Sequence, residues 1–316
     1  MRFPERPSLP RKALLAPLSL TYGAVTAAHR ALWLRPRLRD RAGLPPLIVI
    51  GSLRAGGAGK TAVTLALARA LREDGLKVGI LAYGIHGNRS GTVAHEVAPD
   101  SDWRDSSDEA VLLAREGRSR VFATRDREKA WKLLGRTGEF DILLSDDGLM
   151  DTRLRGAYRI ALVRPGENPG WTDLLPAGPY RLAASFLRQI DHVLPAGEDF
   201  IRKPVLSPEW EPEKAYWALC GLGNPEAFVQ AAREAGARIV GWSAGPDHGL
   251  PNLERALRQA ARAGVDRFLC SEKDWIKLEG DPHRPQHLLR VGERVILAAK
   301  FMEAMRDRVP PRPRTS

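Results

Sequence analysis

The stretch Gly51–Thr61, Gly-Ser-Leu-Arg-Ala-Gly-Gly-Ala-Gly-Lys-Thr, decides the fold. It follows the apolar run Leu47–Ile50, which is typical of a buried parallel strand. It precedes residues 62–73, whose apolar positions recur at helical spacing. A buried strand, a glycine-rich turn, Gly-Lys-Thr and a helix together form the context of a phosphate-binding P-loop. We therefore expect an α/β protein with a P-loop NTPase-type parallel sheet domain.

The loop contains the groups that binding of a nucleotide triphosphate requires. Its glycines allow consecutive backbone N–H groups to converge on phosphate oxygens, and the helix N-terminus adds partial positive charge. Lys60 is expected to reach the β- and γ-phosphates of ATP, and the Thr61 hydroxyl is expected to bind Mg²⁺. Arg54 occupies the position at which the usual motif has its first glycine. The predicted nucleotide-binding residues are Gly56, Gly57, Ala58, Gly59, Lys60 and Thr61.

Acidic residues follow a second buried strand, Phe140–Ser145, as Asp146-Asp147-Gly148. A carboxylate at the carboxyl end of such a strand, downstream of a P-loop, lies beside the Mg²⁺ of the nucleotide. Two adjacent carboxylates repel each other unless a cation is near, so the alternative interpretation is a solvated turn. Upstream, Asp108 and Glu109 precede a helix, and by themselves they are typical of acids in a capped first turn.

Composition narrows the class of protein. The chain has 316 residues, 43% of them hydrophobic, and a formal net charge of +11. This length favours two domains, and the apolar fraction excludes disorder as the main state. Cys220 and Cys270 are far apart, which excludes a disulfide scaffold and a cysteine-rich zinc module. We expect two buried free thiols in a reducing compartment.

Residues 1–44 hold nine basic residues and two acidic ones, so much of the positive charge lies in this segment. Within it, Ala13–His29 has no charged side chain but contains proline, glycine, serine and threonine. A membrane span needs about 20 predominantly apolar residues. The run is flanked by Arg11-Lys12 and Arg30. We therefore expect an interfacial helix on an anionic membrane surface, with its arginines on the headgroups. A helix docked on the protein itself, a secretory signal and a span are the alternatives.

The rest of the chain predicts a second, smaller α/β domain. Two parallel strands, residues 120–123 and 160–163, are expected to flank the Asp-Asp strand, and residues 165–212 are expected to be a loop-rich connection. No nucleic-acid module is recognisable, and we expect neither a nucleic-acid nor a protein partner. The expected organisation is a basic membrane-interfacial helix in residues 1–44, a P-loop domain in residues 45–200 and the smaller α/β domain in residues 201–316.

Seven segments occur in the order and approximate spacing of one known family. They are GSLRAGGAGKT, SSDEAVLLA, FDILLSDDGL, LLPAGPYR at Leu174–Arg181, GLGNPEAF at Gly221–Phe228, GPDHG at Gly245–Gly249 and SEKDWIKL at Ser271–Leu278. The chain resembles tetraacyldisaccharide 4'-kinase, the lipid A kinase of Gram-negative bacteria, over roughly residues 12–300. Gly-Lys-Thr is generic, whereas LLPAGP, the Asp-Asp-Gly-Leu strand end and Ser-Glu-Lys-Asp are specific in combination.

The resemblance implies a peripheral enzyme on the cytoplasmic face of the inner membrane. It implies transfer of the γ-phosphoryl group of ATP to the 4'-hydroxyl of a tetraacylated glucosamine disaccharide 1-phosphate, a glycolipid. It assigns phosphate and Mg²⁺ binding to Lys60 and Thr61, and metal and active-site roles to Asp146 and Asp147. Glu109 would be an acid on the metal side.

For the acceptor, the resemblance makes Asp108 the base for the sugar hydroxyl and His248 the histidine that partners it. Arg181 would lie near the phosphate end of the substrate. Because Asp108 belongs to the first α/β domain and His248 to the second, we expect the active site to lie in the cleft between them, with domain closure on ATP.

Several positions differ from the family pattern. The loop Tyr83–Gly87 lacks the usual arginine, and Ser107-Asp108-Glu109-Ala110 replaces Gly-Asp-Glu-Pro. These differences leave two alternatives open: a P-loop kinase of another glycolipid, and a non-catalytic ATP-binding relative at the membrane. A P-loop GTPase is disfavoured, because no Asn-Lys-x-Asp-type segment for reading guanine is present.

Overall fold

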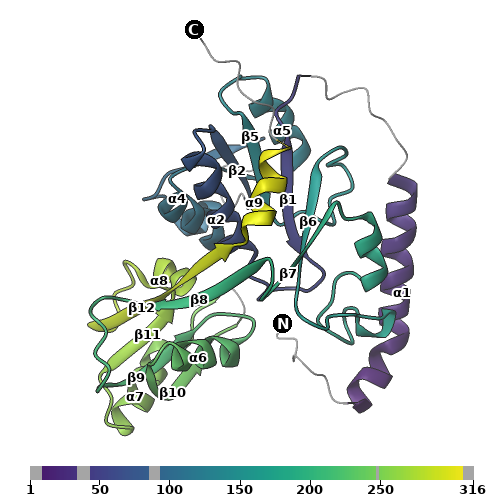
Figure 1. Cartoon of the computed structure of the whole chain (residues 1–316). Helices are drawn as coiled ribbons and strands as arrows, with labels where there is room; N and C mark the ends of the chain where they lie inside the picture. The colour runs from purple at the N-terminus through teal and green to yellow at the C-terminus, as the bar shows by residue number, and fades with distance from the viewer. Residues whose placement is uncertain (1–8, 34–42, 85–92, 247–248, 309–316) are drawn as a thin grey trace. The chain divides into compact units, whose positions relative to one another are not determined.

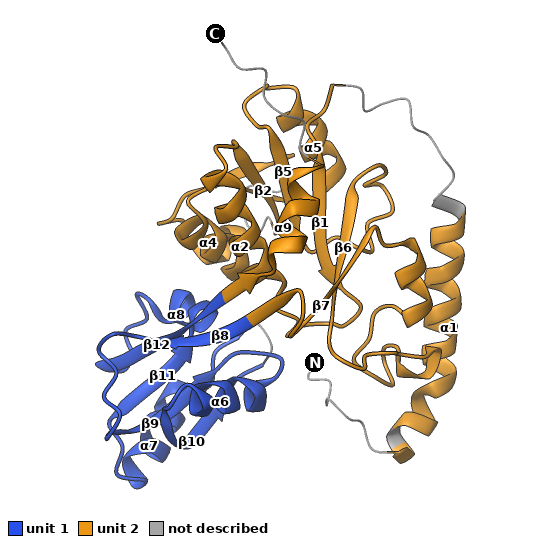
Figure 2. Ribbon diagram, viewed as in Figure 1, with its two compact units in different colours: residues 1–8, 202–294 blue, residues 9–201, 295–316 orange. Residues whose placement is uncertain are grey.

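The computed structural model describes residues 9–33, 43–84, 93–246 and 249–308. The chain divides into two compact units (Figure 2). The P-loop unit comprises residues 9–201 and 295–308, and the smaller unit comprises residues 202–294. Both are α/β structures, as the sequence predicts.

The P-loop unit contains a seven-stranded sheet in the order β3-β4-β2-β5-β1-β6-β7 (Figure 1). Its strands pair in parallel, except that β3 runs antiparallel to β4. The strands are β1 Leu47–Ser52, β2 Val78–Tyr83, β3 His95–Val97, β4 Arg120–Thr124, β5 Ile142–Asp146, β6 Tyr158–Val163 and β7 His192–Pro195.

The Asp-Asp strand β5 lies between β1 and β2, so the expectation that residues 120–123 and 160–163 flank it is wrong. Burial explains the order, because every residue of β1 and β5 is buried, as central strands require. Strand β4 begins with exposed Arg120 and lies one place further out. The register pairs Ile50 with Asp146, which brings the start of the P-loop next to the first of the two aspartates.

Helices cover both faces of this sheet. Helices α2 (Lys60–Glu73) and α4 (Asp108–Gly117) pack against each other and against β2. Helix α5 (Arg127–Gly135) packs on the opposite face, where Trp131 and Leu134 join a cluster with Leu47 and Val49. Alternate residues of β1 therefore serve different faces of the sheet. The short helix α3 (Trp103–Ser106) precedes α4.

The connection after β6 carries more regular structure than its proline content predicts. It holds two 3₁₀ helices, η3 (Trp171–Asp173) and η4 (Ala184–Gln189), and leads into β7 and β8 (Phe200–Leu206). Helix α1 (Leu9–Trp33) contacts η3 and runs along this segment (Figure 1). In the described part of the chain, no helix combines the length and the apolar character that crossing a membrane demands.

Helix α1 is docked on its own unit, as one of the alternatives predicted. Two of the cations that flank the uncharged run of this helix make contacts within the protein. Lys12 forms an ion pair with Asp173. Arg30 is buried, donates to Gln189 Oε1 over 2.7 Å and lies 3.5 Å above the ring of Phe186. Arg30 is thus held within the protein, where the interfacial interpretation expected its arginines on lipid headgroups.

The smaller unit contains a five-stranded sheet in the order β10-β9-β11-β12-β8. Cys220 and Cys270 are buried free thiols in this unit, and burial raises the pKa of Cys270 well above its usual range. The remaining elements are β9 Ala215–Cys220, α6 Pro225–Glu234, β10 Arg238–Ala244, α7 Leu253–Arg262, β11 Arg267–Ser271, α8 Glu272–Leu278 and β12 His287–Leu297.

The last helix, α9 (Ala299–Arg306), groups with the P-loop unit, whereas the sequence analysis placed residues 201–316 together. The physical reason is its packing, because Phe301 and Met305 are buried and Nε of Arg306 lies 2.7 Å from Oδ2 of Asp74. Strand β12 therefore carries the chain back to the P-loop unit. Likewise α1 groups with that unit and does not form a separate compact unit in residues 1–44.

Candidate active site

The loop between β1 and α2 has the backbone that phosphate binding requires. Gly56, Gly57 and Gly59 have φ angles of 74°, 66° and 79°, in the left-handed region that glycine adopts without strain. No atom lies within 4 Å of the position that a Cβ on Gly56 would occupy. Gly59 caps α2 without a side-chain hydrogen bond, so no side chain of the cap accepts from the N–H groups of the first turn. These features fit a triphosphate.

Thr61 and Asp146 form the expected pair beside the loop. The hydroxyl of Thr61 donates to Oδ2 of Asp146 over 2.9 Å, and the hydroxyl of Thr64 donates to Oδ1 over 3.2 Å. All three residues are buried. Within the described residues, no three His, Cys, Asp or Glu side chains form a metal cluster. A hydroxyl and one carboxylate nonetheless fit Mg²⁺, which typically binds one or two carboxylates together with phosphate oxygens and waters.

Asp147 is the centre of a group of positive charges. Its Oδ2 lies 3.0 Å from Nη2 of Arg181 and 3.6 Å from Nζ of Lys60. Burial alone would raise the pKa of Asp147, but the charges of Lys60, Arg181 and Arg127 outweigh it and hold that pKa at about 2. Asp147 itself has a φ of 58°, a left-handed conformation stabilised by a hydrogen bond from Ser145 Oγ to its carbonyl.

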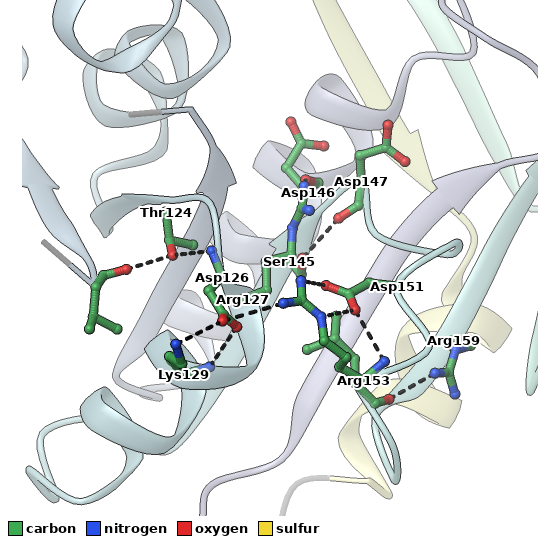
Figure 3. Close-up of polar contacts among 12 residues, drawn as sticks. Thr124, Asp126, Arg127, Lys129, Ser145, Asp146, Asp147, Asp151, Arg153 and Arg159 are labelled. Carbon is green, nitrogen blue, oxygen red and sulfur yellow. Dashed lines mark hydrogen bonds and ion pairs between the residues drawn. The ribbon is translucent and has the colours of Figure 1, made fainter. Parts of the chain in front are cut away.

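Arg127, which the sequence did not single out, lies beside the two aspartates. It is buried, and its Nη2 donates to the carbonyl oxygen of Asp146 over 3.1 Å (Figure 3). Its guanidinium lies 5.3 Å from the centre of the Tyr83 ring. Burial lowers the pKa of Arg127, and the carboxylates of Asp147, Asp151 and Asp146 oppose that shift. In the sequence Arg127 is one of several cations that follow strand β4, and nothing local distinguishes it from Arg125 or Lys129.

Asp151, close to the same turn, is held by a separate set of ionic contacts. Arg153 donates to both carboxylate oxygens of Asp151 over 2.9 Å and lies 3.3 Å from Asp126 (Figure 3). Asp126 in turn caps α5 by accepting from the N–H of Lys129. These bonds fix the turn after the two aspartates against the helix that carries Arg127.

The segment LLPAGPYR lies directly against the P-loop. The N–H of Ala55 donates to Pro179 O over 2.9 Å, and the N–H of Arg181 donates to Leu53 O over 2.8 Å. Arg54 forms an antiparallel bridge with Tyr180, an extended pairing that needs no glycine. This pairing explains why arginine is accepted at the position of the motif's first glycine. It also carries Arg181 to Asp147.

Helix α4 begins at Asp108, so Asp108 and Glu109 lie in its first turn and do not precede the helix. Asp108 is buried, and its Oδ1 accepts a hydrogen bond from the N–H of Glu109 over 2.9 Å. Ser107 caps the helix by accepting from the N–H of Ala110, and it donates to the carbonyl of Tyr83 at the end of β2. Since β2 neighbours β5, Asp108 lies at the same edge of the sheet as Asp146 and Asp147.

Two further predicted features have different outcomes. Arg181 forms an ion pair with Asp147, and the same carboxylate oxygen lies near Nζ of the P-loop residue Lys60. His248 lies outside the described residues, as does most of the divergent loop that follows Gly84. Arg164, which the sequence analysis did not single out, donates to Gly57 O over 3.3 Å from the segment after β6.

The chain is similar to proteins of one family across its length. The family model described as tetraacyldisaccharide-1-P 4'-kinase matches residues 11–310. A tetraacyldisaccharide 4'-kinase of Halorhodospira halophila is 35% identical over 288 residues, with 87% of this chain and 86% of the relative covered. One of Brucella ovis is 30% identical over 301 residues, covering 88% and 85%.

A solved structure, the "apo" form of LpxK from Aquifex aeolicus in complex with ATP, has the same fold. Its TM-score is 0.67 at 22% sequence identity, and the alignment covers 95% of this chain and 99% of that one. This chain belongs to the tetraacyldisaccharide-1-P 4'-kinase family.

Proposed function

We propose that this chain transfers the γ-phosphoryl group of ATP to the 4'-hydroxyl of a tetraacylated glucosamine disaccharide 1-phosphate. One observation carries the proposal beyond membership of the family. Arg181, from the family-specific segment LLPAGPYR, lies 3.0 Å from Asp147, which also pairs with the P-loop residue Lys60. The generic phosphate-binding parts and the family-specific segment thus meet at one carboxylate.

The nucleotide would be held by the loop Gly56–Thr61. Backbone N–H groups of the loop and of the first turn of α2 would bind phosphate oxygens, and Lys60 would neutralise the β- and γ-phosphates. Thr61 and Asp146 would hold Mg²⁺, with Glu109 as a further acid on that side. The metal, when bound, neutralises charge that develops on the phosphate oxygens during transfer.

Asp147 pairs with two cations beside the P-loop, Lys60 and Arg181. Because its pKa is about 2, it is ionised throughout the physiological range and compensates Lys60 and Arg181. Lys60, which belongs to the P-loop, would exchange this carboxylate for phosphate oxygens when a nucleotide enters. Catalysis of phosphoryl transfer depends mostly on such positioning and electrostatics.

Asp108 is proposed to accept the proton of the acceptor hydroxyl, with His248 as its partner. A sugar hydroxyl is a poor nucleophile, so a positioned carboxylate assists its attack. The hydrogen bond from the N–H of Glu109 fixes one oxygen of Asp108 at the start of α4. Arg181 is proposed to lie toward the phosphate end of the acceptor.

Helix α1 is proposed to rest on the anionic membrane at the cytoplasmic face of the inner membrane, as a peripheral anchor. Leu14, Leu18 and Val25 are 79%, 58% and 62% exposed. Their spacing of four and seven residues places them on one side of the helix. That side is opposite to the side that carries Ser19 and Gly23, which face the protein. Docking on the protein and contact with lipid therefore use different faces.

Transfer of labelled phosphate from ATP in detergent micelles tests the proposal. Lys60→Ala and Asp147→Ala should abolish transfer, whereas Lys129→Ala, which removes an exposed lysine of the same unit, should leave it intact. A panel of glycolipid acceptors separates the lipid A precursor from another glycolipid. Binding of ATP without transfer to any acceptor would instead indicate a non-catalytic relative. Replacement of the kinase in a conditional bacterial mutant tests the function in the cell.

A further inference from the structure

The inner face of α1 is joined to the catalytic part of the P-loop unit through one buried side chain. Ser19 has no exposed surface. Its hydroxyl donates to the carbonyl of Leu174 over 2.8 Å and accepts from the N–H of Ala177 over 3.0 Å. The side chain of one helical residue therefore bonds two buried backbone groups of the segment LLPAGPYR. The carbonyl of Leu174 also accepts from the N–H of Gly178, whereas the N–H of Ala177 would lose this acceptor without Ser19.

Further contacts lie on either side of Ser19. Together they form an interface between α1 and residues 171–177, which we call the seam. Lys12 pairs with Asp173, one residue before the segment begins. A Cβ on Gly23 would lie 2.9 Å from Leu174 Cδ1 and 2.9 Å from Trp171 Cε3, so α1 approaches the segment as closely as only glycine permits. The seam thus aligns the helix at two further points, and Ser19 lies between them.

The segment then continues directly into the site. Backbone bonds fold it on itself, with the N–H of Leu175 donating to Tyr180 O over 2.8 Å and that of Gly178 donating to Leu174 O over 2.9 Å. Its far end pairs with the P-loop through Pro179 and Arg181, and Arg181 reaches Asp147. Ser19 and Asp147 are therefore connected through one compact turn, whose backbone and hydrogen bonds link the two contacts.

We propose that Ser19 is a positioning residue: it holds the turn Leu174–Arg181 so that the turn presents Arg181 to Asp147 and supports the first residues of the P-loop. The activity measurements below rest on the proposed kinase function. Helix α1 consequently has two roles on two faces, because the outer face meets lipid and the inner face fixes part of the site. Loss of Ser19 should reduce turnover even where the protein is fully bound to its membrane.

The matched control is Thr21, two residues along the same helix. Its hydroxyl is exposed and donates only within the helix, to Pro17 O over 3.0 Å. Ser19→Ala and Thr21→Ala each remove one hydroxyl from α1, but only the first breaks the connection to Leu174 and Ala177. Both variants are made in the full chain and compared below their melting temperatures.

Three measurements decide the proposal. Hydrogen exchange should become faster at the amides of Ala177 and Ala55 in Ser19→Ala and stay unchanged in Thr21→Ala. At saturating acceptor, kcat should fall about tenfold or more in Ser19→Ala and stay within about twofold in Thr21→Ala, since small displacements of a site cost this much. Sedimentation with phosphatidylethanolamine–phosphatidylglycerol vesicles should be the same for both variants.

An equal kcat in the two variants, or a loss in Ser19→Ala that saturating acceptor restores, would overturn the proposal. If Ser19→Ala does not fold, Lys12→Gln provides the same test, because it loosens the same seam at a partly exposed ion pair. If the unmodified protein transfers no phosphate, the proposed function fails, but exchange at Ala55 still decides whether Ser19 supports the P-loop. Unchanged exchange at Ala55 and Ala177 would then refute it.

Discussion

The hydroxyl of Thr61 donates to Oδ2 of Asp146 over 2.9 Å, which joins the first turn of α2 to the end of β5. We expect Thr61→Ala to lower kcat about a hundredfold, because the variant loses a proposed Mg²⁺ ligand. Thr61→Ser keeps the hydroxyl and should retain most activity.

Thr64→Val removes the other hydroxyl on the same carboxylate and should mainly cost stability, about 1–3 kcal/mol. Steady-state kinetics and urea unfolding of the three variants check this; equal turnover in Thr61→Ala and Thr61→Ser would contradict it.

Asp147 should make the stability of the protein sensitive to acid. Its folded pKa is about 2, below the ordinary value of about 4. Stability from a depressed carboxyl pKa is fully present above the unfolded pKa and is lost as the pH falls toward the folded pKa. The free energy of unfolding should therefore fall more steeply from about pH 5 to about pH 3 in the unmodified chain than in Asp147→Asn. Parallel urea denaturation curves measure both slopes, and identical slopes would rule out this contribution.

Ser107 carries backbone strain next to the proposed base. Its φ of 132° is a conformation that favours glycine, the residue the family pattern has there. Ser107→Ala keeps the strain and loses the cap, so it should destabilise the protein by about 1 kcal/mol. Ser107→Gly relieves the strain and costs only a few tenths for the cap. Its free energy of unfolding should equal or exceed that of the unmodified chain, and a loss as large as that of Ser107→Ala would refute the strain argument.

The outer face of α1 should decide membrane binding. Leu18→Glu places a charge on the proposed lipid-facing side and should weaken binding to anionic vesicles by about tenfold or more, given the apolar burial it removes. Leu133→Glu is the control, because Leu133 on α5 is comparably exposed, 51% against 58% for Leu18. Vesicle sedimentation compares them. Equal binding by the two variants would show that α1 does not use this face.

The central part of the fold could be predicted because its signals are local. A buried run such as Leu47–Ile50, followed by glycine-rich backbone and a helical pattern, determines a P-loop within a short stretch of sequence. The two aspartates could be placed for the same reason, since they directly follow a buried strand. Composition also predicted buried free cysteines, which the structure confirms.

Strand order and chain pairing could not be predicted, because they depend on contacts between distant residues. Nothing in the sequence near Asp146 indicates that β1, and not the strand that follows β5, is its neighbour. Arg127 and Ser19 were missed for a similar reason: an arginine on a helix and a serine in an apolar run are unremarkable until their partners, Asp146 O and Leu174 O, are known. The position of α9 likewise depends on distant contacts, because Phe301 and Met305 are buried in a unit whose other residues precede them by about a hundred positions or more.

The most direct test of the account is transfer of the γ-phosphate of labelled ATP to a tetraacylated glucosamine disaccharide 1-phosphate in micelles, by the unmodified chain, Lys60→Ala and Lys129→Ala. The account predicts a 4'-phosphorylated product from the unmodified chain and from Lys129→Ala, and none from Lys60→Ala. Normal transfer by Lys60→Ala would contradict the assignment of Gly51–Thr61 as the site that holds the nucleotide.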